Sequence, residues 1–349
     1  MTMKNRQSVA RILLLSVAFL VLCSPALAQH YEYDVQQIWS NGTYSSFTDL
    51  IKYKGTFYCA FREGRGHVFD ERGKAEGKIR IIASKNGRKW HSVLLVGEDG
   101  MDYRDPKLSV TPDGRLMVSI GVSVYVDRKA RAQYSYVCFS SDGRHYTKPE
   151  RCLVDDDHSR RHDWIWRVTW HDGIGYAVDY FTQPEQGCWL LSTTDGIRYT
   201  KVCSFDIPDF PNEATVRFLP ESGRMAVMVR RDAGNGMGYW ATASSPYTQW
   251  EWHQMPLRLG GPDFLLLDEN HFVACSRCLH IPGHPTTSVY TGDAATGRVS
   301  QQFVLPSAGD TSYPGMLVER NELWISYYSC HETEWPSIYL ARIPMKCFK

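Results

Sequence analysis

A unit of roughly fifty residues recurs along this 349-residue chain, a period typical of propellers and solenoids. Each copy contains short runs rich in Val, Ile, Tyr, Trp and Phe, separated by Gly, Asp, Asn and Pro, which is the pattern of strands and turns. The first strands begin at Thr48, Asp105, Trp166, Glu213, Asp263 and Tyr313. We therefore predict an all-β fold, a six-bladed β-propeller of four-stranded antiparallel blades.

The last copy lacks a fourth strand before the chain ends near Lys349. A spare strand-like run, residues 31–39, precedes the first copy. Because propellers leave only short, protected sheet edges, we expect this N-terminal strand to pair with the last copy and close the ring.

Three turns between third and fourth strands share the pattern Ser/Thr-x-Asp/Asn-Gly-x-x-aromatic, at residues 84–90, 140–146 and 193–199. Asp or Asn can hydrogen-bond its own turn backbone, and Gly can adopt a positive φ. The turns resemble the Asp boxes (BNR repeats) of sialidase-like propellers, and the resemblance covers essentially all of 29–349. Asp boxes are structural, so this resemblance implies the fold and not the chemistry.

The N-terminus has the features of an export signal. Lys4, Arg6 and Arg11 precede an apolar run, 12–23, which is too short to span a bilayer, and a small-x-small signature ends at Ala28. We predict a signal peptide at 1–28, cleavage after Ala28, a propeller at 29–349 and a secreted or periplasmic location. No later run is long enough to cross a membrane, so we expect no membrane insertion after cleavage.

The chain is almost neutral, with a formal charge of +1. A nucleic-acid-binding protein would show a basic excess, so no nucleic-acid partner is expected. The balance leaves glycans and peptides open as ligands. We expect a monomer with a glycan or oligosaccharide substrate, and no metal or other cofactor.

The six predicted first strands each carry a polar residue near their start, followed by apolar residues. These residues are Asp49, Asp105, Arg167, Glu213, Asp263 and Tyr313. Inner strands of a propeller converge on a central channel, so residues at one end of each strand would line a funnel. Strand starts often carry turn-forming Asp, but Arg, Glu and Tyr are poor turn formers. We therefore predict a functional site here.

Several of these segments are similar to the sialidases. The resemblance rests on Asn212-Glu213-Ala214-Thr215, Val227-Met228-Val229-Arg230 and Ser312-Tyr313-Pro314-Gly315. It implies that Tyr313 is a nucleophile, that Glu213 takes its proton, and that Arg230 and Arg277 clamp an anionic terminal sugar. A phenol with a pKa near 10 needs such a base at neutral pH. Strand alternation allows only one of Arg230 and its neighbour Arg231 to face the site.

The chain departs from the sialidases at its first inner strand. Sialidases have an arginine there that binds the sugar carboxylate, whereas this chain has Phe47-Thr48-Asp49-Leu50. An acid, Asp49, thus replaces the arginine, and a sugar other than sialic acid becomes plausible. The long loop after Arg62 offers Asp70 or His67 as the acid/base. We also count Arg62 and His67 among the candidate substrate-binding residues, with Arg167, Asp105 and Asp263.

Three other functions remain open. Arg104-Asp105-Pro106 resembles a furanosidase motif, and Asp49, Asp105 and Glu213 could form its three carboxylates. A uronate polysaccharide lyase would use His67 or Tyr313 as base. A non-catalytic carbohydrate-binding propeller would bind sugar without turnover.

Two tryptophans are candidates for stacking on a sugar, Trp166 and Trp335. Our principal hypothesis is an exo-acting glycoside hydrolase of sialidase type.

Overall fold

A computed structural model describes residues 33–154, 162–183, 185–279 and 283–348. The predicted signal peptide, its cleavage site and the start of the predicted closing strand at Tyr31 lie outside these residues. The described chain is built from β-strands, with one 3-10 turn at Met345–Phe348. None of its helices has the length and apolar character needed to cross a membrane.

Four of the five sheets contain four antiparallel strands. Their strands are, in order across each sheet, β2 (Tyr44–Tyr53), β3 (Thr56–Gly64), β4 (Lys78–Ser84) and β5 (His91–Val96); β16 (Pro211–Phe218), β17 (Met225–Arg231), β18 (Met237–Ala243) and β19 (Glu251–Arg258); β20 (Asp263–Leu266), β21 (His271–Cys278), β22 (Thr286–Asp293) and β23 (Val299–Leu305); β24 (Ser312–Glu319), β25 (Glu322–Ser329), β26 (Ser337–Pro344) and β1 (Asp34–Trp39). In the last of these, β1 pairs antiparallel with β26, so the start of the described chain supplies its fourth strand.

The fifth sheet has ten strands and corrects the prediction of six separate blades. It contains two meanders. The first consists of β6 (Asp102–Val110), β7 (Leu116–Val126), β8 (Lys129–Ser140) and β9 (Glu150–Arg151). The second consists of β12 (Thr169–His171), β13 (Ile174–Gln183), β14 (Gly187–Thr193) and β15 (Arg198–Phe205). The meanders merge because β11 (His162–Ile165) pairs with both β8 and β13. The short strand β10 (Leu153–Val154) adds to β15. The predicted strand starting at Trp166 is instead an irregular segment between β11 and β12.

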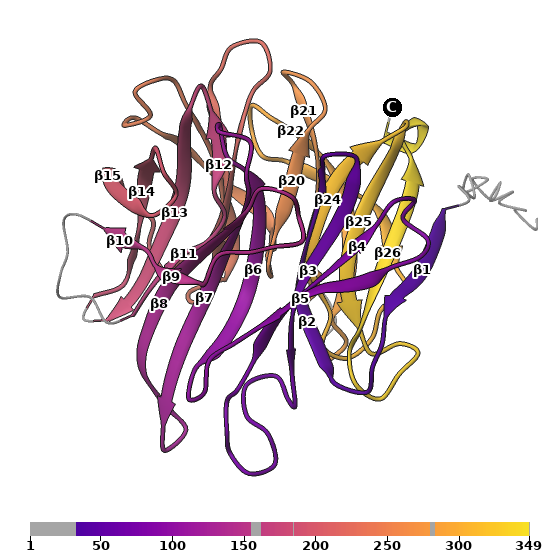
Figure 1. The fold of residues 1–349 in the computed structure, drawn as a ribbon. Helices are drawn as coiled ribbons and strands as arrows, with labels where there is room; N and C mark the ends of the chain where they lie inside the picture. The colour runs from indigo at the N-terminus through magenta and orange to yellow at the C-terminus, as the bar shows by residue number, and fades with distance from the viewer. Residues whose placement is uncertain (1–32, 155–161, 184, 280–282, 349) are drawn as a thin grey trace, which may run out of the picture. The chain divides into compact units, whose positions relative to one another are not determined.

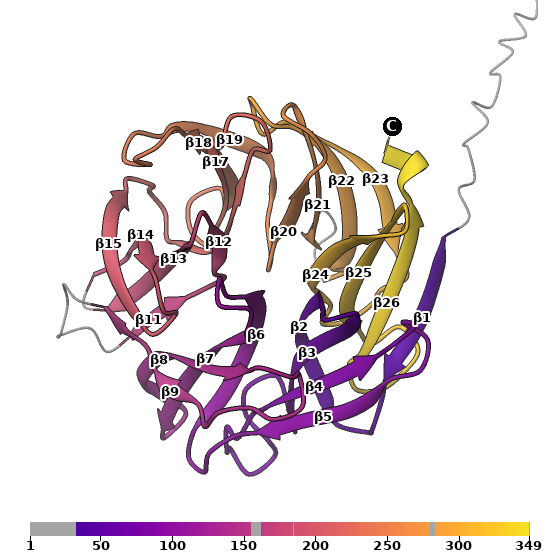
Figure 2. The same ribbon diagram turned by 45° about the horizontal axis from the view of Figure 1, so that its top comes forward.

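The sheets stand around a common centre (Figures 1 and 2). The innermost strands β2, β6, β12, β16, β20 and β24 contact one another in that order, and β24 contacts β2 again. This ring brings the start of each inner strand toward the starts of the others, although the strands are far apart in sequence.

The three repeated turns have one geometry. In the first, the amide of Gly87 donates to Ser84 Oγ over 2.9 Å, and the amide of Arg88 donates to Asn86 Oδ1 over 2.9 Å. The turns at 140–146 and 193–199 repeat both bonds. Each turn glycine has a positive φ and lies against a side chain of the preceding meander or sheet, where a Cβ would overlap it. The repeated motif therefore both forms a turn and packs neighbouring sheets together.

One hydrophobic cluster packs the sheet that begins with β2 against the sheet that begins with β24. It includes Leu50, Phe57, Trp324 and Tyr328, and the rings of Phe57 and Trp324 stack with centroids 4.5 Å apart. Tyr313 belongs to the same cluster. Tyr313, which is predicted to be catalytic, is thus packed within this hydrophobic cluster, and the packing restricts the rotation of its side chain.

Candidate active site

Bulges at the start of the inner strands aim side chains toward the centre. The pairing register shifts at Ser46/Asp49, Arg104/Lys107, Pro211/Ala214 and Ser312/Gly315. The first bulged residues Phe47, Asp105 and Tyr313 have φ values of 59°, 49° and 50°. Positive φ is costly for residues other than glycine, and bulges and strained backbone of this kind recur beside functional sites. Phe47, not the predicted Asp49, is therefore the structural equivalent of Asp105 and Tyr313.

Tyr313 and Glu213 are in direct contact. The phenol Oη donates to Glu213 Oε1 over 2.7 Å, and the amide of Gly261 donates to Glu213 Oε2 over 2.8 Å. Burial raises the pKa of Tyr313 well above its ordinary value. Burial also raises the pKa of Glu213, but the charge and hydrogen bond of Arg230 and the hydrogen bond from Tyr313 outweigh it and lower the pKa overall. The phenol is thus held protonated beside an ionised carboxylate, which can accept its proton.

Arg230 connects the two members of this pair. Its Nη1 donates to Glu213 Oε2 over 2.7 Å and to Tyr313 Oη over 2.8 Å. Its Nε donates to Asp232 over 3.0 Å. The neighbouring Arg231 instead binds Asp209 over 2.9 Å, as strand alternation predicts for two successive residues.

Asp310 organises a second group of side chains next to the pair. Its carboxylate accepts hydrogen bonds from Arg277 over 3.1 Å, from Tyr328 over 2.9 Å and from Tyr44, and lies 2.7 Å from His67 Nδ1. Arg277 also lies over the Tyr313 ring at 5.1 Å from its centroid. Burial raises the pKa of Asp310, but the hydrogen bonds and charges of its partners lower it to about 2.

Asp105 is the other carboxylate near the phenol. It is 7% exposed, and its Oδ1 is without a hydrogen-bond partner among the described residues. Its Oδ2 lies 3.5 Å from Arg104 Nε. Burial raises the pKa of Asp105, and the charge of Asp105 in turn raises the pKa of Tyr313. The unpartnered Oδ1 is itself buried from solvent, so no hydrogen bond offsets the burial of this oxygen in the described structure.

Asp49 belongs to a different, fully buried cluster. Its Oδ1 binds Arg167 Nη1 over 2.7 Å, and its Oδ2 accepts the amide of Leu108 over 2.6 Å. Arg167 also lies 3.4 Å from Asp263, which binds Arg217 over 2.7 Å. Asp49, Arg167 and Asp263 were predicted at one rim with Glu213 and Tyr313, but in this structure they form ion pairs with one another. Arg167 Nε and Asp263 Oδ2 have no hydrogen-bond partner among the described residues. The cluster joins inner strands of different sheets.

Comparisons with solved structures give the architecture. A Dyadobacter fermentans protein of unknown function matches 89% of this chain and 99% of its own at 16% identity, with a TM-score of 0.73. Trypanosoma rangeli sialidase in complex with the inhibitor DANA matches with a TM-score of 0.64 at 10% identity. The fold is that of a sialidase-like β-propeller.

The match to the sialidase covers 86% of this chain but only 55% of the sialidase. Penicillium chrysogenum alpha-L-arabinanase complexed with arabinobiose shares the propeller, with a TM-score of 0.64 at 12% identity over 90% of this chain and 97% of its own. No protein-family model matches the chain. No curated protein matches it either.

Two further residues that were predicted for the site, Arg62 and Trp166, are buried in this structure. Arg62 is 1% exposed, binds Asp102 over 2.7 Å and donates to the carbonyl of Gly66 over 2.8 Å, so it holds the loop that carries His67. Trp166 is 2% exposed, with its ring 6.2 Å from that of Tyr313. In this structure Trp166 therefore supports the phenol ring and does not offer a face to a sugar.

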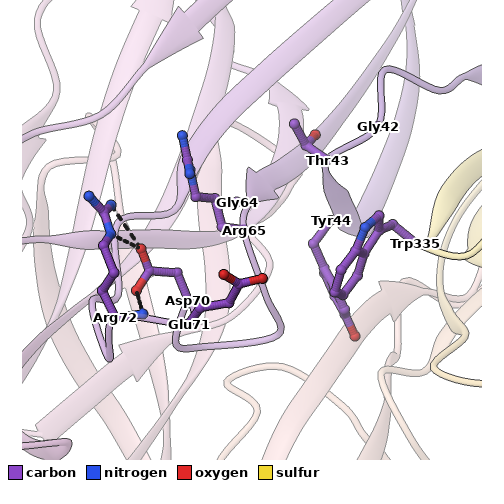
Figure 3. Close-up of a pocket in the computed structure, with 9 residues that line it drawn as sticks. All are labelled: Gly42, Thr43, Tyr44, Gly64, Arg65, Asp70, Glu71, Arg72 and Trp335. Atoms are coloured by element: carbon purple, nitrogen blue, oxygen red, sulfur yellow. Dashed lines mark hydrogen bonds and ion pairs between the residues drawn. The ribbon is translucent and has the colours of Figure 1, made fainter.

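Asp70 lines a pocket on the loop after β3 (Figure 3). Its carboxylate accepts the amides of Arg72 and Lys74 over 2.9 and 2.8 Å and also binds the Arg72 side chain. Hydrogen bonds from Lys74 and Arg72 lower the pKa of Asp70. Its contacts are with its own loop, so Asp70 shapes the loop and is a poorer proton donor than expected.

Sequence reasoning missed Asp310, Tyr44, Phe47 and Gly261. Only Asp310 had a usable signal, because it lies three positions before Tyr313 in a turn after Gly309. Within the described residues, no group of three or more His, Cys, Asp or Glu side chains is placed to hold a metal ion.

Proposed function

We propose that this protein is an exo-acting glycoside hydrolase in which Tyr313 is the nucleophile and Glu213 its base. The observation that carries the proposal is the 2.7 Å hydrogen bond from Tyr313 Oη to Glu213 Oε1, next to two arginines. The sialidase and arabinanase structures support it, because both neighbours are named for cleaving glycosidic bonds on the same fold. A neutral phenol with a carboxylate base is also the arrangement by which sialidases differ from two-carboxylate glycosidases.

The reaction follows from these contacts in two steps. Tyr313 Oη attacks the anomeric carbon while its proton moves to Glu213, and the glycosidic C–O bond breaks as its oxygen takes a proton from an acid. Water then attacks the same carbon, the phenolate leaves, and Glu213 returns the proton to Tyr313. The attacking water keeps one proton in the new sugar hydroxyl and gives the other to the ionised acid, which is thereby restored. Arg230, bonded to both residues, stabilises negative charge on the phenolate as it leaves.

We assign the proton donor to Asp105. Its pKa is raised by burial, its Oδ1 is free of partners among the described residues, and its charge acts on Tyr313. His67 is the alternative, held by Asp310 through Nδ1. The three-carboxylate alternative loses support because Asp49 is bound to Arg167 and to a backbone amide.

The substrate in this proposal is the terminal sugar of a glycan. Arg277 donates a hydrogen bond from Nη1 to Asp310. We assign its guanidinium to the binding of an anionic group on that sugar. The bulge of the first inner strand carries Phe47, whose ring lies 5.0 Å from that of Tyr313, and the sialidase arginine has no counterpart in residues 47–50, so the proposal does not require sialic acid. We further propose that the chain is exported by a signal at 1–28.

A glycan-panel digestion tests the function. Purified protein is incubated with neutral and anionic oligosaccharides, beside Tyr313→Phe and Glu213→Gln. We expect released terminal sugar from the wild type and a loss of at least about 100-fold in both variants. Full activity in both variants would refute the assigned pair. Ultraviolet absorbance from an unsaturated product would identify a lyase, and binding without turnover would identify a carbohydrate-binding protein.

A further inference from the structure

A pocket of about 350 Å³ opens beside the candidate active site, and no step of the proposed reaction uses it. Tyr44 and Trp335 line one side, and Arg65, Glu71 and the Asp70–Arg72 pair lie on the facing loop (Figure 3). Its volume lies within the range of pockets that bind small molecules. Its mixture of aromatic faces and hydrogen-bonding groups matches a sugar, which has apolar C–H faces and polar edges.

Trp335 gives this pocket an aromatic platform. Its side chain lies in the loop between β25 and β26 and is 42% exposed, although most tryptophans of the described chain are buried or half-buried. The hydroxyl of Thr333 donates to the carbonyl of Trp335 over 2.7 Å, and the Tyr44 ring lies 6.1 Å away. An exposed indole on a hydrogen-bonded loop offers a large apolar face with few rotatable bonds to a ligand.

The facing loop offers polar groups. The carboxylate of Asp70 accepts amides of its own loop and binds Arg72 over 2.9 Å, which fixes that wall. No residue in the described ranges forms an ion pair with Arg65, which is exposed at the rim. Its guanidinium can therefore donate to sugar hydroxyls without giving up an internal partner.

Tyr44 belongs to both the pocket and the active site. Its ring lines the pocket, while its hydroxyl donates to Asp310, which also binds Arg277 beside Tyr313. A second connection runs from Tyr44 to the His67 ring at 6.0 Å, from there to Phe47 at 5.3 Å, and then to Tyr313 at 5.0 Å. The pocket and the phenol are therefore linked through side chains that contact one another.

We infer that this pocket is a leaving-group subsite, which binds a sugar unit of the glycan on the far side of the bond that Tyr313 attacks. The inference rests on the proposed glycosidase function. It adds that the enzyme selects oligosaccharides, because a terminal sugar with a leaving group as small as fluoride would leave Trp335 uncovered. Binding energy from this remote unit would appear in kcat/KM for long substrates.

The test compares two substrate lengths in Trp335→Ala, Trp335→Phe and the control Val318→Ala. Val318 is 49% exposed at the other end of β24 from Tyr313. The probes are glycosyl fluorides, whose leaving group is too small to reach Trp335, and oligosaccharides of sialyl, arabinosyl and galacturonosyl type. For the sugar that is cleaved, we expect Trp335→Ala to lower the ratio of oligosaccharide to glycosyl-fluoride kcat/KM about tenfold, which is about 1.4 kcal/mol. Trp335→Phe should restore most of the ratio, and Val318→Ala should keep it.

An unchanged ratio in Trp335→Ala would overturn the subsite. If the wild type cleaves no probe, the proposed function fails, and the pocket is then tested alone by calorimetric titration with the same oligosaccharides. Saturable binding that Trp335→Ala weakens and Val318→Ala retains would support the subsite. Absence of binding to every probe, or equal binding by both variants, would overturn it.

Discussion

Tyr313 Oη and Glu213 Oε1 lie 2.7 Å apart, although the two residues are separated by 100 positions in the chain. Tyr313 follows a loop into β24, and Glu213 lies in a bulge of β16. Arg230 from β17 bonds to both of them. Three strands from two sheets therefore build one hydrogen-bonded unit.

Gly261 limits where the Tyr313 ring can lie. It has a φ of +57°, its amide holds Glu213, and a Cβ at this position would overlap the ring. We expect Gly261→Ala to lower kcat about 100-fold, since small misplacements of a reacting group cost this much. Gly114→Ala is the control, because Gly114 has a φ of +81° with no atom near its Cβ position. It should lose stability by about 1 kcal/mol and keep its activity. Equal kinetic losses would contradict this explanation.

Asp49 should contribute to stability and not to catalysis. Asp49→Asn leaves Asp263, 3.4 Å away, as the charged partner of the buried Arg167. Losing one partner of a buried ion pair costs about 3 kcal/mol in the free energy of unfolding, measured by urea denaturation. Asp113→Asn, at an exposed pair with Arg115, should cost less than about 1 kcal/mol. A fully stable but inactive Asp49→Asn protein would instead make Asp49 catalytic.

Asp105 should set the alkaline limb of the pH–rate profile. A general acid works only when protonated, so activity falls as the pH rises through its pKa. Burial raises the pKa of Asp105, which places this fall at a higher pH than for an exposed aspartate. We expect kcat/KM of Asp105→Asn to be low and to lack this limb, while His67→Gln keeps it. Loss of the limb in His67→Gln alone would transfer the role to His67.

Asp310 should stabilise the fold in a pH-dependent way. Its folded-state pKa of about 2 lies below its unfolded value, so its stabilisation is present above the unfolded pKa and is lost as the pH falls through the folded one. At pH 6 the ionised carboxylate contributes about 2 kcal/mol, and less at pH 3. The difference in the free energy of unfolding between wild type and Asp310→Asn, measured by urea denaturation, should therefore be smaller at pH 3 than at pH 6. A constant difference from pH 6 to pH 3 would exclude the linkage.

Several features could be predicted from local patterns. The turn motif at 84–90 and its two copies specified both the turn hydrogen bonds and the positive φ of the glycine, because all of these groups lie within seven residues. Period-two alternation also placed Arg230 and Arg231 on opposite sides of one strand. The repeat spacing was sufficient to predict that Glu213 and Tyr313 lie at the same end of the inner strands.

The register of the bulges could not be predicted in this way. A bulge is defined by the strand opposite, so nothing near Phe47 in sequence shows that it, and not Asp49, is the equivalent of Tyr313. The merging of two meanders depends likewise on β11 pairing with both neighbours.

By itself, the sequence determined the strands, the turns and the repeat, because these depend on hydrogen bonds and side-chain alternation within a few residues. Only the tertiary structure decided which charged groups neutralise one another and which stay available. Arg167 is bound by Asp49 and Asp263, while Asp105 keeps an unpartnered oxygen. These pairings join inner strands of different sheets, so their energies exist only after the ring has closed.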